Sequence, residues 1–253
     1  MNLVVLFLSI FCNLWIWRIF SLNSLLFLVL IFSSLLIIFS HFKRNTIFSL
    51  LFLGSLFLLI IFQYKYTKPP TSLTLMTNND IYIKDTRMKE YPPVKISAFG
   101  KTLWLPVAHW FEERKEIIAI GRIANNFSEI IDLNLYFFAN HPRERVAVNE
   151  FEKFPYLFLP FFIYGILKLN KRILKIIPVL LFCIIIFLSF IGNKNELGPF
   201  ILFPFFALFL FFGFQNFYFT IRKKYRQEKI IILTSLFVLL GLVMAQLISY
   251  VIV

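Results

Sequence analysis

The chain has 253 residues, of which 59% are hydrophobic and only 15% are charged. A soluble domain usually carries about a quarter charged residues, so this composition argues against an ordinary soluble protein. The formal net charge of +13 does not predict nucleic-acid binding, because no DNA- or RNA-binding motif accompanies it. Half of the 26 basic residues lie in one polar segment that also holds 11 acidic residues, and the others lie in short loops between apolar runs.

Seven apolar stretches are almost free of charge, and each predicts a membrane-spanning helix because about 20 residues cross a hydrocarbon core. The predicted spans are residues 2–20, 24–41, 46–63, 154–169, 176–192, 199–219 and 230–252. We expect the first to be a retained span, since it lacks the basic start and the small-residue cleavage site of a signal peptide. The fourth is short and contains Pro160, so an interfacial segment is the alternative there.

The loops between the predicted spans alternate in charge. One set holds two, four and five Lys or Arg residues, at 43–44, 168–175 and 222–229. Short loops rich in Lys and Arg stay in the cytoplasm, which predicts a cytoplasmic N-terminus and an extracytoplasmic C-terminus. The cytoplasmic membrane of a prokaryote is the expected location.

The polar segment, residues 64–153, is predicted to be a small extracytoplasmic α+β domain inserted between the third and fourth spans. Ile81 to Ile83 predicts a strand, and Val94 to Leu105 predicts a hairpin with a turn at Gly100 and Lys101. Apolar residues at helical spacing predict one amphipathic face, made of Ile120, Ile123, Ala124, Phe127, Ile130 and Ile131. The chain thus divides into a three-span region (1–63), this domain and a four-span region (154–253).

The 35 Phe residues favour no aromatic binding site. Such a Phe-rich and Lys-rich composition is typical of an AT-rich genome, and Phe is well tolerated facing lipid.

A first candidate site lies at His109, Glu112 and Glu113. On a helix His109 and Glu113 stand one turn apart on one face, which is a spacing used by metal ligands. One such pair is not a zinc-protease motif, and a solvated helix face with paired charges is the favoured interpretation. The sequence therefore predicts no metal site and leaves any cofactor undetermined.

A second candidate site lies at His141, Arg143 and Arg145. Two arginines one residue apart could hold a phosphate group, because guanidinium binds phosphate through two parallel hydrogen bonds. Above the outer leaflet, that group would be the diphosphate of a lipid-linked sugar or a phospholipid headgroup. The favoured alternative is a turn whose arginines pair with Glu144 and Glu150.

The function expected from these patterns is that of a non-catalytic cell-envelope component, which presents an extracytoplasmic domain for interaction or assembly. Its expected partners are the lipid bilayer and a membrane or envelope protein. The alternative is a membrane transferase or hydrolase acting on a polyprenyl-phosphate or phospholipid substrate. In it Glu112 or Glu113 with His109 would serve as base or metal site, and Arg143 and Arg145 would hold phosphate. Transport is less favoured, because no predicted span contains Asp or Glu and no internal repeat is present.

Overall fold

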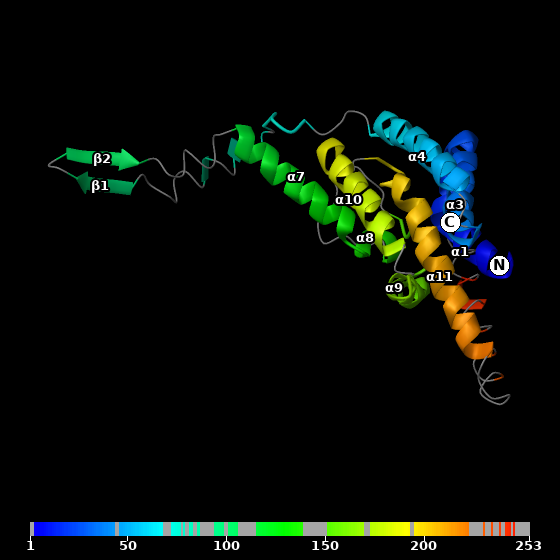
Figure 1. The fold of residues 1–253 in the computed structure, drawn as a ribbon. Coiled ribbons are helices and arrows are strands. Elements are labelled where there is room, and N and C mark those ends of the chain that lie inside the picture. Colours follow the sequence, from blue (N-terminus) through cyan, green and yellow to red (C-terminus); the bar gives the residue numbers. More distant parts are fainter. Residues whose placement is uncertain are drawn as a thin grey trace.

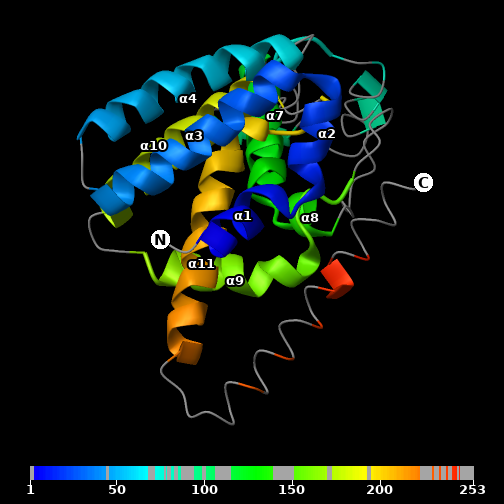
Figure 2. The ribbon, with the colours of Figure 1, turned by 90° about the vertical axis from the view of Figure 1, so that its right-hand side faces the viewer.

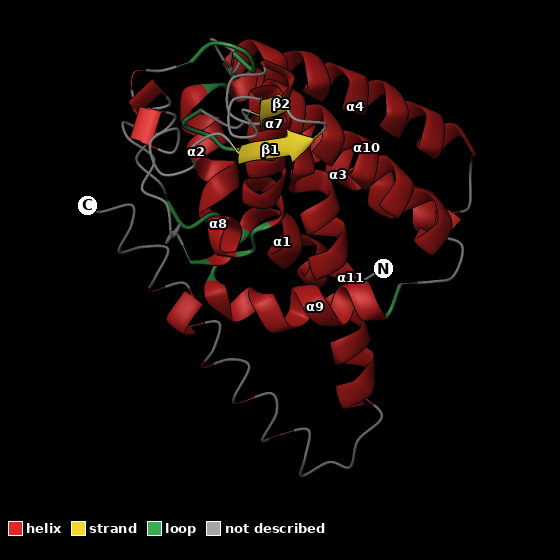
Figure 3. Cartoon of the chain, turned by 90° about the vertical axis from the view of Figure 1, so that its left-hand side faces the viewer, coloured by secondary structure: helices red, strands yellow, loops and turns green. Residues whose placement is uncertain are grey.

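The structure is a computed structural model of the chain. It describes residues 3–43, 46–67, 72–76, 78, 81–82, 85–86, 94–98, 101–105, 115–138, 151–169, 173–192, 195–222, 230, 234, 238, 241–243 and 245. Most of this part is helical, with two short strands, which are yellow in Figure 3. A helical membrane protein is therefore the fold class.

The predicted first span is a bent pair of helices, α1 (Leu3–Phe11) and α2 (Leu14–Leu22), whose axes differ by 62°. Asn13 makes the break, because its side-chain oxygen accepts from the Ile16 backbone N–H (2.9 Å) and its amide donates to the Ile10 carbonyl (2.8 Å). A single buried side chain thus satisfies backbone groups of both helix ends, as a membrane interior requires.

The next two predicted spans are confirmed as continuous helices, α3 (Ser24–Lys43) and α4 (Thr46–Tyr66). They pack against each other side by side, as Figure 2 shows. The helix α11 (Phe203–Arg222), which follows the 3-10 turn η2 (Phe200–Leu202), lies at the centre of the fold. Its span is 83% buried, against 28% for α4, so α11 is enclosed by protein while α4 faces outward.

The number of spans is smaller than predicted. In the described part, three helices are long and apolar enough to cross a membrane, or four if the bent pair is one span. The helix α10 (Ile173–Ile191) matches the fifth prediction, although its described apolar stretch is short. The seventh prediction, 230–252, lies mostly outside the described residues.

The predicted fourth span is not a single long helix. After the 3-10 turn η1 (Tyr156–Phe158), only α9 (Leu159–Leu167) is helical. Phe154 stacks on Phe203 at the start of α11, whereas Phe161, seven residues later, contacts Phe217 near its end. Those 14 residues of α11 rise about 21 Å, so the segment passes along α11 largely through its non-helical beginning.

Two glycines let α9 cross α11 at backbone contact. A Cβ atom at Gly165 would overlap the Phe209 carbonyl oxygen, and one at Gly213 would overlap the Phe161 carbonyl oxygen. Figure 2 shows α9 lying across α11. Small residues allow such approach in membranes, where packing rather than water exclusion holds helices together.

The hairpin prediction is confirmed, but the strand prediction at Ile81 is wrong. Strands β1 (Val94–Ala98) and β2 (Lys101–Leu105) pair antiparallel, and Lys101 faces Ala98 inside the ladder rather than lying in the turn. Ile81 and Tyr82 are helical, and the Thr86 hydroxyl donates to the Tyr82 carbonyl (2.9 Å), four residues earlier. Asn78 is helical as well, which fits the preference of Asn for helix starts as well as for turns.

The predicted α+β domain is not seen as a separate unit. The amphipathic helix α7 (Lys115–Ile131) packs along α10, and the short α8 (Asn134–Phe137) lies inside the helical core. Figure 1 shows the hairpin apart from this helical body. The second half of the insert is thus built into the membrane helices, because α8 supplies core side chains: Leu135, Tyr136 and Phe137.

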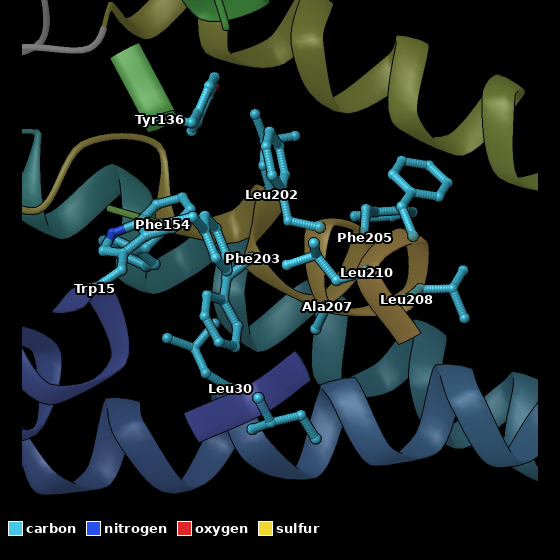
Figure 4. Close-up of a cluster of buried hydrophobic side chains, with 14 of the residues drawn as sticks. Trp15, Leu30, Tyr136, Phe154, Leu202, Phe203, Phe205, Ala207, Leu208 and Leu210 are labelled. Carbon is cyan, nitrogen blue, oxygen red and sulfur yellow. The ribbon is translucent and has the colours of Figure 1, made fainter. Parts of the chain in front are cut away.

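Much of the Phe content forms the protein core, which corrects the lipid-facing interpretation. All seven Phe residues of α11 between 203 and 214 are buried. Figure 4 shows Trp15 and Phe154 beside Phe203 at one end of this cluster. Offset and edge-to-face ring pairs contribute about 0.5–1.5 kcal/mol each beyond the area they bury, so the aromatic side chains favour this one packing arrangement.

Candidate functional site

The predicted site residues His109, Glu112, Glu113, His141, Arg143 and Arg145 all lie outside the described residues. The two predicted clusters therefore remain predictions. The structure does describe Phe138 and Phe151, which flank the segment 139–150 that contains the second cluster. Both ends join the helical core at one place, and we describe that place as the candidate site.

The two ends of the segment 139–150 are held together by backbone hydrogen bonds. The Tyr136 carbonyl oxygen accepts from the N–H groups of both Lys153 (3.1 Å) and Phe154 (2.8 Å). We call Tyr136, Lys153 and Phe154, together with the Trp15 side chain that contacts them, the loop base. The chain therefore enters and leaves the segment 139–150, which contains the two arginines, at one place in the core.

Lys153 is buried at the loop base, with only 3% of its surface exposed. Its ammonium group donates to the Leu135 carbonyl oxygen (2.8 Å) and lies 5.2–5.9 Å from the ring centres of Phe151, Tyr136 and Trp15. A buried charge is tolerated only when hydrogen bonds and electron-rich ring faces replace its water. The protein itself therefore supplies the hydrogen-bond acceptor and the aromatic rings that surround this ammonium group.

Trp15 links the loop base to the loop before α11. Its ring is fully buried, its indole N–H donates to the Leu197 carbonyl (2.7 Å), and its backbone N–H donates to the Lys153 carbonyl (3.2 Å). Edge-to-face contacts at 5.7 Å join its ring to Phe154 and Phe203. Trp15 lies in the first turn of α2, directly after the bend at Asn13.

The loop before α11 is also bonded to α4 through a polar cluster, which consists of Gln63, Thr67 and Asn195. The Gln63 amide donates to the Gly198 carbonyl (3.2 Å), and its oxygen accepts from the Ile201 N–H (3.3 Å). The Asn195 amide donates to the Thr67 hydroxyl (3.2 Å), which donates to the Gln63 carbonyl (2.8 Å). These bonds satisfy backbone groups at the start of α11, where a helix leaves its first N–H groups unpaired.

Gly198 is required where the polar cluster meets the loop base. Its φ of 68° lies in the left-handed region, which strongly favours glycine. A Cβ atom there would also lie 2.7 Å from Cε of Lys153. The left-handed φ therefore favours glycine here, and any larger residue would in addition have to displace the end of the Lys153 side chain.

No protein-family model, curated protein or solved structure matches this chain. Its function is therefore argued from the described geometry.

The hydrogen bonds of the site join segments that are far apart in the sequence. Its buried donors and acceptors connect α2, α4, the loop base and the loop at 195–199 through the contacts given above. Arg18 adds a second cation, 4.5 Å above the Phe151 ring. Within the described ranges, no group of three or more His, Cys, Asp or Glu side chains is placed to hold a metal ion.

The burial of Lys153 and Trp15 at the loop base was not predicted from the sequence. Lys153 was counted among the solvated charges of the insert, and Trp15 among the residues of an ordinary span. A signal did exist, because Lys153 stands between Phe151 and Phe154 directly before a predicted span. A charge in such apolar surroundings calls for a partner, but the sequence does not identify which one.

The side chain of Gln63 is expected to contribute to stability through its two hydrogen bonds to the loop before α11 and to η2. Its replacement by Leu leaves the Gly198 carbonyl and the Ile201 N–H without their side-chain partner in a buried place. We expect the variant to lose about 1–3 kcal/mol of unfolding free energy. Equilibrium unfolding in mixed detergent micelles measures this loss. Tyr64→Leu, at an exposed position of the same helix, is the control, and equal losses for both variants would contradict the role of the polar cluster.

Proposed function

We propose that the protein is a non-catalytic membrane scaffold, which holds the segment between α4 and α9 in place for a partner protein at the extracytoplasmic surface. In this proposal the helices act as the support, and the segment carries the recognition. The enzyme hypothesis built on His109, Glu113 and Arg143 stays a prediction from the sequence.

One observation carries the proposal, namely the closure of the loop base on the core. The buried Lys153 and Trp15 are used to fasten residues 136–154 to α2 and to the loop before α11. A buried ionised group is expensive to keep, and breaking its contacts is strongly destabilising. The contacts of Lys153 and Trp15 therefore support a role in which the segment between α8 and α9 must be held in one position for its partner.

The proposal includes an orientation. The basic residues after α3, α9 and α11 favour a cytoplasmic location for those ends, which puts the loop base and the start of α11 at the outer surface. In this arrangement α10 returns through the bilayer to the outer surface.

Site-specific photocrosslinking in native membranes tests the proposal. Leu75 and Tyr82 lie in the insert and are 70% and 71% exposed, so a photoreactive side chain there would meet a bound partner. We expect both positions to give the same discrete protein adduct. Leu50, 66% exposed on the outward face of α4, is the control and should give lipid adducts only. Lipid adducts alone at all three positions would contradict the scaffold role.

A cysteine scan tests the orientation separately. Tyr82→Cys should react with a membrane-impermeant maleimide in intact cells with a permeable outer layer. Reaction only after lysis would place the insert in the cytoplasm and reverse the proposed orientation.

A further inference from the structure

The apolar face of α7 is divided between two environments. The sequence pattern assigns Ile123, Phe127 and Ile130 to one face together with Ile120 and Ile131. In the structure Ile130 is only 1% exposed, Phe127 packs against the core, and Ile123 is partly buried. The other two are 62% and 47% exposed. Half of the amphipathic face is therefore left open.

The open half is a continuous stripe. At 100° per residue, Ile117, Ile120, Ala124 and Ile131 fall within an arc of about 60°, and all four are exposed. Asn125 and Ser128 are also exposed and lie on the adjoining arc, which is polar. The stripe thus runs along the whole helix, with a polar border on one side.

The charged residue Arg122 does not share this stripe. It lies on the opposite side of the helix, and its guanidinium donates to the Ser72 carbonyl oxygen. The stripe can therefore meet an apolar environment without burying an arginine.

The stripe continues the outward surface of α10. The two helices pack along each other, the Asn126 amide donates to the Ser189 carbonyl (2.8 Å), and Figure 1 shows them side by side. From Ile176 onward, where the side chains of α10 are described, its exposed residues are apolar and include Ile176, Val179, Phe182, Ile186 and Phe190. A membrane helix with such a face meets acyl chains, so its neighbour in contact meets the same boundary.

We propose that the stripe of α7 lies against lipid acyl chains beside α10, with the polar border turned toward the aqueous side. A helix that packs along a membrane-spanning neighbour meets the same lipid on the side that it leaves open. The proposal assigns α7 a binding partner, the lipid of the same membrane. It rests on the proposed placement of α10 in the bilayer.

Fluorescence quenching in vesicles tests this placement. Three proteins each carry one cysteine, labelled in detergent with an environment-sensitive dye: Ile120→Cys, Asn125→Cys, and the protein retaining the exposed Cys183 of α10. Other cysteines are replaced by Ala. The proteins are reconstituted into phosphatidylcholine and phosphatidylglycerol vesicles. Spin-labelled lipid should quench the dyes at 120 and 183 several-fold more than the dye at 125, whereas aqueous iodide should favour 125.

The three positions separate the possible failures. Lipid quenching at 183 combined with iodide quenching at 120 would overturn the placement of α7 and leave that of α10 intact. Iodide quenching at both would overturn the membrane placement of α10 as well. Protection of 120 from both quenchers would show that protein covers the stripe, which also overturns the proposal. Elution of the labelled proteins with the unlabelled protein on size exclusion verifies the fold.

Discussion

Replacing Trp15 with Ala is expected to cause the largest loss of stability of any single side-chain truncation in the described core. The substitution removes a fully buried ring between Phe154 and Phe203, together with the hydrogen bond to the Leu197 carbonyl. Truncations of this size cost about 3–5 kcal/mol, chiefly through the cavity that remains. Equilibrium unfolding in mixed micelles, together with the thermal midpoint in detergent, measures the effect.

Two further variants divide the contribution of Trp15. Trp15→Phe keeps most of the ring contacts and loses the indole N–H, so we expect about 1–3 kcal/mol from the unpaired Leu197 carbonyl. Trp17→Ala is the matched control, because Trp17 lies two residues away in the same helix and is 46% exposed. The account would be wrong if Trp17→Ala destabilised the protein as much as Trp15→Ala.

Gly213→Leu is expected to have the second large effect, by forcing α9 away from α11. At this crossing even a Cβ atom overlaps the Phe161 carbonyl oxygen, and that atom belongs to the backbone, which cannot rotate away. Overpacking costs about 1–3 kcal/mol where side chains can adjust, and a backbone overlap leaves less room for adjustment. We expect loss of the monodisperse folded protein on size exclusion after mild heating.

Gly54 provides the control for this crossing. It lies within α4, where a Cβ atom would meet no atom within 4 Å. Gly54→Ala should leave stability unchanged or raise it by up to about 1 kcal/mol, since Ala favours helix more than Gly. Gly213→Ala should lower stability, so the same substitution is expected to have opposite signs at the two positions. Equal effects would contradict the close crossing.

Continuous apolar runs were sufficient to predict the regular helices. The runs at 24–41 and 46–63 correspond to α3 and α4, because an uninterrupted apolar stretch of this length favours a helix whatever its neighbours are. The hairpin β1–β2 was also predicted, from its alternating pattern. The first span was predicted less well, because one polar residue in an apolar run, Asn13, ends one helix and caps the next through local hydrogen bonds. The fourth was predicted less well, because its beginning packs on α11 through Phe154.

Tertiary contacts decide the features that the sequence did not predict. The pattern around Ile120 and Ile130 predicts an amphipathic helix but not which half of its face meets protein. Likewise, Phe residues facing lipid and Phe residues facing α9 have the same hydropathy. The loop base joins Trp15 to Lys153 across more than a hundred residues, and hydropathy contains no information on such pairing.

Hydrogen exchange of the protein in lipid nanodiscs tests the central claim most directly, namely that the loop base is part of the helical core. The backbone N–H groups of Lys153 and Phe154 are bonded to Tyr136 inside this core. We predict that they exchange as slowly as those of α11, and that Trp15→Ala makes them exchange fast. Fast exchange at Lys153 and Phe154 in the unaltered protein would contradict the account.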